Sequence, residues 1–315
     1  MKKTLMMALA LLLTISLGAC QDANADDGRP VVITTLYPQY DFTRRISDDS
    51  VNVQYLLPPG ISAHAYDPSP QDVIDILEAD LFIYTGETME PWVESTILPS
   101  AKKQDVEILN LSNHVELIAK DHDHEAIHEE DAEADDVDPH IWTDPLNAVL
   151  MVEAIETALA EIVGSDARES LASNTDAYIS RLQAYHADVQ HVLDQAEHDV
   201  IMHGGHNAFG YFIHRYGLEY VTPYEGFSTD SEPTPGAIAD MVDTMDAHGV
   251  DHLFAETLID PRVAEAIGEE TGADILYLHT AGNVSKDAFE RDVSYLDMMR
   301  DNLSALKEGL NYHGE

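Results

Sequence analysis

The chain has 315 residues, enough for two domains of ordinary size, and 44% of them are hydrophobic, which is ample for a core. Its 59 acidic residues outweigh 16 basic ones and give a net charge of −43. Such a surface repels nucleic acid and anionic lipid headgroups, so the charge argues against a nucleic-acid partner. We interpret most of this acidity as surface hydration in a salty environment and not as a binding site.

Residues 1–19 predict a lipoprotein signal peptide. Two lysines, Lys2 and Lys3, precede an apolar run at 5–17 that is too short to span a bilayer comfortably. The run ends in the sequence LGAC, which resembles a bacterial lipobox. This resemblance implies cleavage before Cys20, acylation of that cysteine, and anchoring to the membrane outside the cytoplasm, at the cell surface or in a periplasm. The alternative is a coincidental cysteine behind an ordinary signal peptide.

The next two segments predict a tether at residues 20–29 and an N-terminal α/β lobe at residues 30–165. Strands are expected at residues 31–36, 51–57, 81–84 and 106–111. Helices are expected around residues 73–77 and at 146–163. Strands that alternate with helices are typical of parallel α/β layers. Residues 121–138 interrupt this pattern, because they are acidic, contain histidines and have few large apolar side chains, and they predict a surface loop.

Residues 166–198 carry the longest helical pattern. Apolar side chains recur there at three, four or seven residues, with neither proline nor glycine between Gly164 and Gly204. About 30 residues would form a rod of roughly 45 Å. It could be a surface helix on a single domain, or a rigid strut that links two lobes. We expect the strut, because residues 199–315 then resume the α/β alternation as a C-terminal lobe. Strands are expected there at residues 200–202, 220–223, 252–255 and 275–278, and helices at 234–248, 261–271 and 287–308.

Four of the sixteen histidines occupy positions suited to a binding site. They are His64, His140, His206 and His279, two from each lobe, and at least three of them follow the carboxyl end of a predicted strand. Parallel sheets place their ligands at that edge, so a cleft between the lobes could gather all four. Four neutral imidazoles suit tetrahedral zinc, whereas nickel, copper and cobalt remain alternatives and magnesium and calcium are disfavoured.

Several motifs around these histidines resemble a known family, the zinc/manganese ABC-transporter substrate-binding lipoproteins (TroA-like, zinc type). The motifs are PGISAH, DPHIWTDP, HNAFGY, EETGA and YLDMMR, which begin at residues 59, 138, 206, 269 and 295. The resemblance covers essentially the whole mature chain in order. It implies two lobes bridged by one long helix, a metal ion between them, and His64, His140 and His206 as three of its ligands. It also implies a monomeric carrier, not an enzyme, that delivers metal to an ABC permease and its ATPase.

At the fourth ligand position the chain departs from the family pattern, because many members have aspartate where this chain has His279. Either His279 binds the metal or another group completes the site. Manganese-type members tend to have carboxylates as third and fourth ligands, so imidazoles here favour zinc.

Other residues near the motifs have two interpretations each. Asp138 and Asp144 are candidates for orienting the imidazoles, or for turn and helix-capping roles. His122, His124 and His128 could capture metal weakly, as the histidine-rich loop of zinc-type members implies, or belong to a solvated acidic loop.

Two other functions compete with transport. A zinc hydrolase would keep an open metal position beside a general base. The chain has no HExxH motif, no GxSxG elbow and no phosphate-binding GKS loop. An extracellular metal buffer or adhesin is the second alternative, and stoichiometric binding without turnover would separate carrier from hydrolase.

Overall fold

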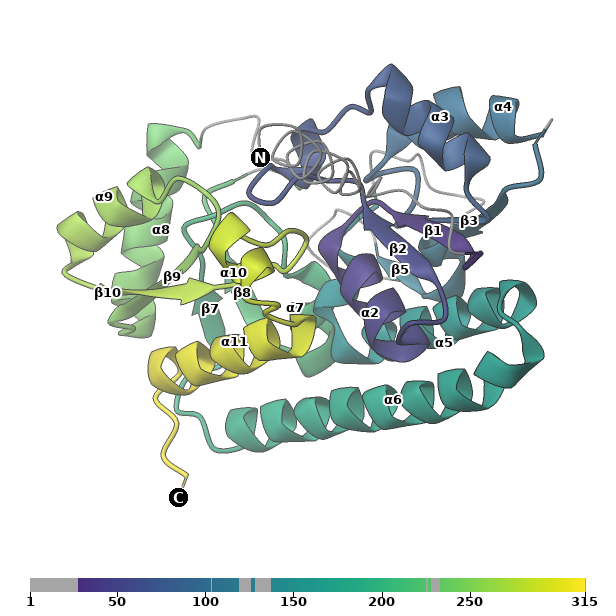
Figure 1. Ribbon diagram of the computed structural model, residues 1–315. Coiled ribbons are helices and arrows are strands. Elements are labelled where there is room, and N and C mark those ends of the chain that lie inside the picture. Colours follow the sequence, from purple (N-terminus) through teal and green to yellow (C-terminus); the bar gives the residue numbers. More distant parts are fainter. Residues whose placement is uncertain are drawn as a thin grey trace, which may run out of the picture.

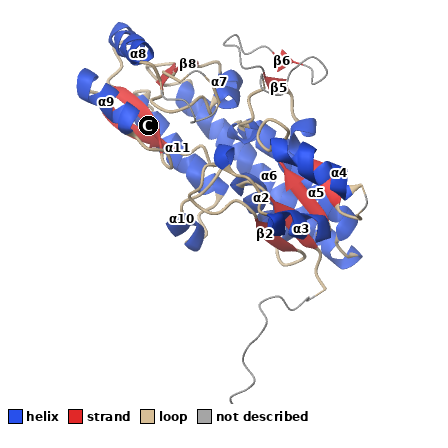
Figure 2. Cartoon of the chain, turned by 90° about the horizontal axis from the view of Figure 1, so that it is seen from above, coloured by secondary structure: helices blue, strands red, loops and turns tan. Residues whose placement is uncertain are grey.

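The computed structural model describes residues 28–102, 104–118, 126–127, 137–224, 226–227 and 233–314. The predicted lipidation site Cys20 and the loop histidines His122, His124 and His128 lie outside these residues. Within them, the α/β architecture expected from the sequence is confirmed, with two lobes of parallel strands and helices (Figures 1 and 2).

The N-terminal lobe is built on one parallel sheet of order β2-β1-β3-β4. The strands are β1 (Val31–Thr34), β2 (Asn52–Tyr55), β3 (Leu81–Tyr84) and β4 (Glu107–Asn110). All four residues of β3 are buried, as expected for a central parallel strand covered on both faces. One face packs against α2 (Tyr37–Ser47) and α5 (Pro145–Ile162), and the other packs near α3 (Pro70–Glu78). The short helix α4 (Leu98–Ala101) and the antiparallel pair β5 (Leu117–Ile118) and β6 (Ala126–Ile127) complete this lobe.

The predicted long helix is confirmed as α6 (Ser165–Leu193), with 29 residues and a length of about 44 Å. Its buried side chains form one stripe, from Leu171 through Leu182 to Val192. Helix α6 contacts α2 and α5 of the N-terminal lobe and α11 (Tyr295–Gly309) of the C-terminal lobe, and it runs beneath both lobes in Figure 1.

The C-terminal lobe contains two parallel strand pairs. They are β7 (Val200–Met202) with β8 (Glu219–Val221), and β9 (His252–Glu256) with β10 (Asp274–Leu278). A parallel bridge between His203 and Phe254 connects the pairs. The helices of this lobe besides α11 are α7 (Gly210–Tyr216), α8 (Pro235–His248), α9 (Arg262–Thr271) and α10 (Lys286–Glu290).

The structure differs from the sequence prediction in several helices. The prediction of a single helix at 287–308 is wrong, because the chain forms two separate helices there, α10 and α11. Asp292 between them adopts a φ of 55°, which a helix cannot accommodate, and Ser294 caps α11 by accepting from the backbone N–H of Asp297. Helices α2, α4 and α7 were not expected from the sequence.

One hydrophobic cluster extends through both lobes. It includes Phe42 of α2, Leu182 of α6, and Phe254 and Leu306 of the C-terminal lobe. Because these apolar side chains pack in one continuous cluster, the lobes share a core beneath the cleft between them. Among the residues that the structure describes, none of the helices combines the length and apolarity needed to cross a membrane.

Candidate metal centre

His64 reaches the cleft from the N-terminal lobe. The loop that leaves β2 turns at Pro58–Gly60, where Gly60 has a φ of 86°, and continues into a short 3₁₀ turn (Ala63–Ala65) that carries His64. The imidazole is half-buried, and Gly60 supplies the left-handed backbone that a residue with a Cβ rarely adopts.

His140 comes from the segment before α5 and is buried, with 2% of its surface exposed. Its backbone N–H donates to Asp138 Oδ1 at 2.9 Å, and its ring Nδ1 lies 2.8 Å from the same oxygen. Because a carboxylate oxygen accepts, the ring proton belongs on Nδ1 and the Nε2 lone pair faces the cleft. Burial holds the pKa of His140 well below its usual value, and nearby His206 lowers it further, so the ring is neutral.

His206 is held in the same way by a carboxylate of another strand. Glu256 ends β9, and its Oε1 lies 2.6 Å from His206 Nδ1 and accepts the His206 backbone N–H at 3.1 Å. Burial alone would raise the pKa of Glu256, but His206, His203 and His140 together outweigh that effect, and the pKa is lowered. A Cβ on Gly205 would lie 2.3 Å from Glu256 Oε1, so only glycine allows this approach. Sequence reasoning missed Glu256, although an acidic residue at the end of an apolar strand was a usable signal.

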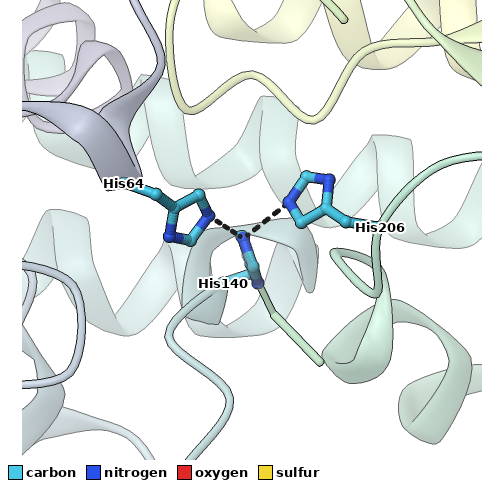
Figure 3. Close-up of side chains that lie close together, drawn as sticks. All are labelled: His64, His140 and His206. Atoms are coloured by element: carbon cyan, nitrogen blue, oxygen red, sulfur yellow. Dashed lines mark hydrogen bonds between the residues drawn. The ribbon is translucent and has the colours of Figure 1, made fainter. Parts of the chain in front are cut away.

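The three imidazoles converge on one point between the lobes (Figure 3). His140 Nε2 lies 3.2 Å from His64 Nε2 and 3.4 Å from His206 Nε2, and the ligand atoms of all three lie within 4.8 Å of one another. Zinc–nitrogen bonds of 2.0–2.1 Å at tetrahedral angles would separate two nitrogens by about 3.3–3.4 Å. With the ring protons on Nδ1, the Nε2 atoms of His140 and His206 are both acceptors. A cation between them would relieve their repulsion.

His279 is not part of this group. It follows β10, with Nδ1 3.1 Å from Thr257 Oγ1 and Nε2 3.9 Å from Asp301 Oδ2. Burial lowers its pKa, and Asp301 opposes that effect. Asn302 holds the His279 backbone on both sides, because Asn302 Oδ1 accepts from His279 N and Asn302 Nδ2 donates to His279 O.

The two candidate orienting aspartates have different surroundings. Asp138 contacts His140, as described above. Asp144 caps α5 by accepting from the backbone N–H of Leu146 at 2.9 Å, and it forms an ion pair with Arg215 at 2.6 Å. The helix-capping alternative therefore describes Asp144.

The cleft around the three imidazoles has a volume of about 60 Å³. Both lobes line it, with Ile61, Met89 and Trp142 on one side and Leu258 and Thr280 on the other. The space is large enough for a bound ion.

Comparisons with known proteins place the chain in a family. The family described as "ZnuA: Zinc-uptake complex component A periplasmic" matches residues 32–309. The chain is 29% identical over 314 residues to the zinc-binding lipoprotein AdcA of Streptococcus pneumoniae serotype 4. This match covers 99% of the present chain and 62% of AdcA. It is 32% identical over 287 residues to the high-affinity zinc uptake system protein ZnuA of Bacillus subtilis. This match covers 89% of the present chain and 87% of the Bacillus protein. The chain thus spans less than two thirds of the length of AdcA.

Solved structures share the fold. The Zn(II)-bound ZnuA-like domain of S. pneumoniae AdcA superposes with a TM-score of 0.75 at 28% identity, over 90% of this chain and 100% of that domain. The laminin-binding protein Lmb of Streptococcus agalactiae, described as having adhesin and metal transporting activity, gives a TM-score of 0.76 at 26% identity, over 90% and 99% of the two chains. The resemblance to metal-binding receptors is thereby confirmed, and the chain belongs to the ZnuA family, the zinc-uptake complex component A.

Proposed function

We propose that this protein is an extracytoplasmic receptor that captures Zn²⁺ and delivers it to an ABC importer. His64, His140 and His206 bind the ion through their Nε2 atoms. The observation that carries the proposal is the convergence of these three nitrogens, at separations of 3.2 and 3.4 Å that suit one bound zinc.

The chemistry of the ligand set favours zinc over harder ions. Imidazole nitrogen suits zinc, copper and nickel, whereas magnesium, calcium and manganese prefer oxygen ligands. Asp138 and Glu256 lie behind His140 and His206, so their charge makes the ring nitrogens more basic and partly neutralises the ion. We assign the fourth position to water or to another small group in the cleft, because His279 faces Thr257 and Asp301.

Delivery follows from family membership and from the anchor. Acylation at Cys20 would hold the monomeric receptor at the outer side of the cell membrane, where a permease and its ATPase accept the metal. The names of AdcA and of the Bacillus ZnuA, a zinc-binding lipoprotein and a zinc uptake protein, support this assignment. The shared core beneath the cleft limits hinge motion between the lobes, so we expect release to depend on the importer disturbing the cleft.

A hydrolase is the competing proposal, because three imidazoles and an open position are also found in catalytic zinc sites. A general base would then be needed near the bound water. Glu256 is a carboxylate that lines the cleft, but its Oε1 already accepts from His206. We therefore favour transport, and a search for ester or peptide turnover by the zinc-loaded protein tests the alternative.

The decisive experiment is metal binding by purified variants. Native mass spectrometry and metal analysis should show one tightly bound zinc per chain. Each of His64→Ala, His140→Ala and His206→Ala should weaken binding at least a hundredfold with the fold intact. His186→Ala is a matched control, because that imidazole contacts Tyr216 on α7 and lies outside the cleft. Unchanged affinity in any of the three variants would refute the ligand set.

His279 needs a separate comparison. On this structure His279→Ala should bind zinc nearly as tightly as the parent, because its ring is directed at Thr257. A hundredfold loss in that variant would show that His279 enters the site when metal binds.

A further inference from the structure

A segment of the C-terminal lobe reaches across the cleft to the N-terminal lobe. Residues 280–284, which we call the strap, follow β10, and Thr280, Gly282 and Asn283 of the strap line the cleft together with residues 60–64. The strap is fixed at its start. Trp142 Nε1 donates to the carbonyl of Thr280 at 2.7 Å, and the backbone N–H of Tyr37 donates to the carbonyl of Gly282 at 3.1 Å. A Cβ on Gly282 would lie 2.9 Å from the Trp142 ring, so the two pack without space between them.

Both polar atoms of the Asn283 side-chain amide form hydrogen bonds, with the N-terminal lobe and with the backbone of the strap. Its Nδ2 donates to the carbonyls of Pro58 at 2.9 Å and Ile61 at 2.6 Å. Its Oδ1 accepts from the Tyr55 hydroxyl at 2.7 Å and from the backbone N–H of Val284 at 2.6 Å. A flipped amide would set N–H groups against two donors, so the contacts specify one orientation. The side chain is only 7% exposed, which strengthens these bonds.

The two carbonyls bound by Asn283 are the ends of the turn that leads to His64. Residues 58–61 have Pro59 second and Gly60 third, with a φ of 86° at Gly60, a pattern typical of a type II turn. The backbone N–H of Gly60 also donates to the carbonyl of Val284 at 2.9 Å. The strap therefore holds this turn at both ends and in the middle, three residues before His64.

His64 depends on this support more than the other two imidazoles do. His140 and His206 are buried, whereas His64 is half-buried on a 3₁₀ turn of three residues. The position of so short a turn follows from the segment that precedes it. Because an error of about 1 Å in a ligand strongly affects a site, whatever sets the 58–61 turn also sets the metal geometry.

We propose that Asn283 is the positioning residue for His64: it ties the His64 turn of one lobe to the strap of the other, and so sets the metal-binding separation of His64 from His140. This inference rests on the proposed zinc site. Asn283 does not touch the metal and acts through His64 alone.

The test is a double-mutant cycle on zinc affinity, measured by competition with a chromophoric chelator. Asn283→Ala should weaken zinc binding about tenfold or more, within the range for partners that orient metal ligands. In a His64→Ala background the same substitution should change the affinity less than twofold, because the residue it positions is gone. Asn174→Ala is the matched control. It removes another amide that donates to a main-chain carbonyl, that of Ile46, outside the cleft, and should leave affinity unchanged in both backgrounds.

A second variant and an unfolding measurement separate a lost positioning contact from a general loss of folding. Asn283→Asp keeps the side-chain size but directs a carboxylate oxygen at the Pro58 and Ile61 carbonyls, and it should weaken zinc at least as much as Asn283→Ala. Thermal unfolding of both metal-free variants checks that they fold. An equal loss in the presence and absence of His64, or no loss in either variant, overturns the positioning role. If His64→Ala alone binds zinc like the parent, the proposed ligand set fails first, and the positioning role fails with it.

Discussion

The charge of Glu256 should tune the affinity of the metal centre, and Glu256→Gln isolates that charge. The amide has nearly the shape of the carboxylate, and its oxygen can still accept from the backbone and ring nitrogens of His206, at the present 3.1 and 2.6 Å. What disappears is a buried negative charge directly behind a ligand. The pKa of Glu256 is lowered in the folded protein, so this charge is present throughout the neutral range.

We expect Glu256→Gln to bind zinc ten to a hundred times more weakly than the parent. Removal of a carboxylate that orients a metal-bound imidazole costs affinity in that range, or about 1.4–2.8 kcal/mol at 1.4 kcal/mol per factor of ten. The carboxylate is 4% exposed, so water screens it little and the upper part of the range is the better expectation.

Glu90→Gln provides a matched control. Glu90 is 3% exposed, and it accepts from neutral donors of Thr35, Thr85 and Gly86. The affinities of parent, Glu256→Gln and Glu90→Gln should be measured by chelator competition at one salt concentration and at a pH well above 7, because burial raises the pKa of Glu90 to about 7 and its carboxylate is mostly ionised only above that value. Equal affinities in all three would refute the reasoning, because the carboxylate behind His206 would then have no electrostatic effect on the metal. An equal loss in both variants would show that any buried carboxylate matters and that contact with His206 does not.

Four further outcomes follow from the sequence and the structure. Gly205→Ala places a Cβ 2.3 Å from Glu256 Oε1, so it should displace the carboxylate, weaken zinc at least as much as Glu256→Gln and lower the melting temperature, both measurable on one preparation. Burial raises the pKa of Glu90 from 4.5 to about 7, so the folded state retains a proton that the unfolded state has lost. The resulting stability of the metal-free protein, about 3 kcal/mol, is complete below pH 4.5 and lost as the pH rises to about 7; denaturant titrations of Glu90→Gln should lack this pH-dependent contribution. Cys20→Ala should abolish lipid labelling and membrane retention in cell fractionation, and unchanged retention would exclude the lipobox. Deleting residues 121–133 should leave the tight site nearly intact in equilibrium titrations while slowing uptake at scarce metal, whereas a large loss of affinity would mean that this segment supplies a ligand.

Local patterns along the chain were sufficient for much of the architecture. Short apolar runs correctly predicted strands such as β3 and β9, because a strand buried in a parallel sheet needs apolar side chains on both faces. The helical period of the apolar residues correctly predicted α6, because only one stripe of that helix is buried. The same approach failed at 287–308, where periodicity continues through Asp292 although the backbone does not.

The sequence by itself determined the two-lobed α/β plan and the loops that carry the histidines, since strand ends and turn residues are encoded locally. Only the tertiary structure decided which side chains meet. Glu256 reaches His206 across 50 residues, Asn283 reaches the His64 turn across more than 220, and His279 is directed at Thr257 although it follows a strand end like the others. These contacts depend on how strands of different lobes are juxtaposed around a shared core. That arrangement results from the packing of the whole chain, so no pattern within a short window of sequence contains it.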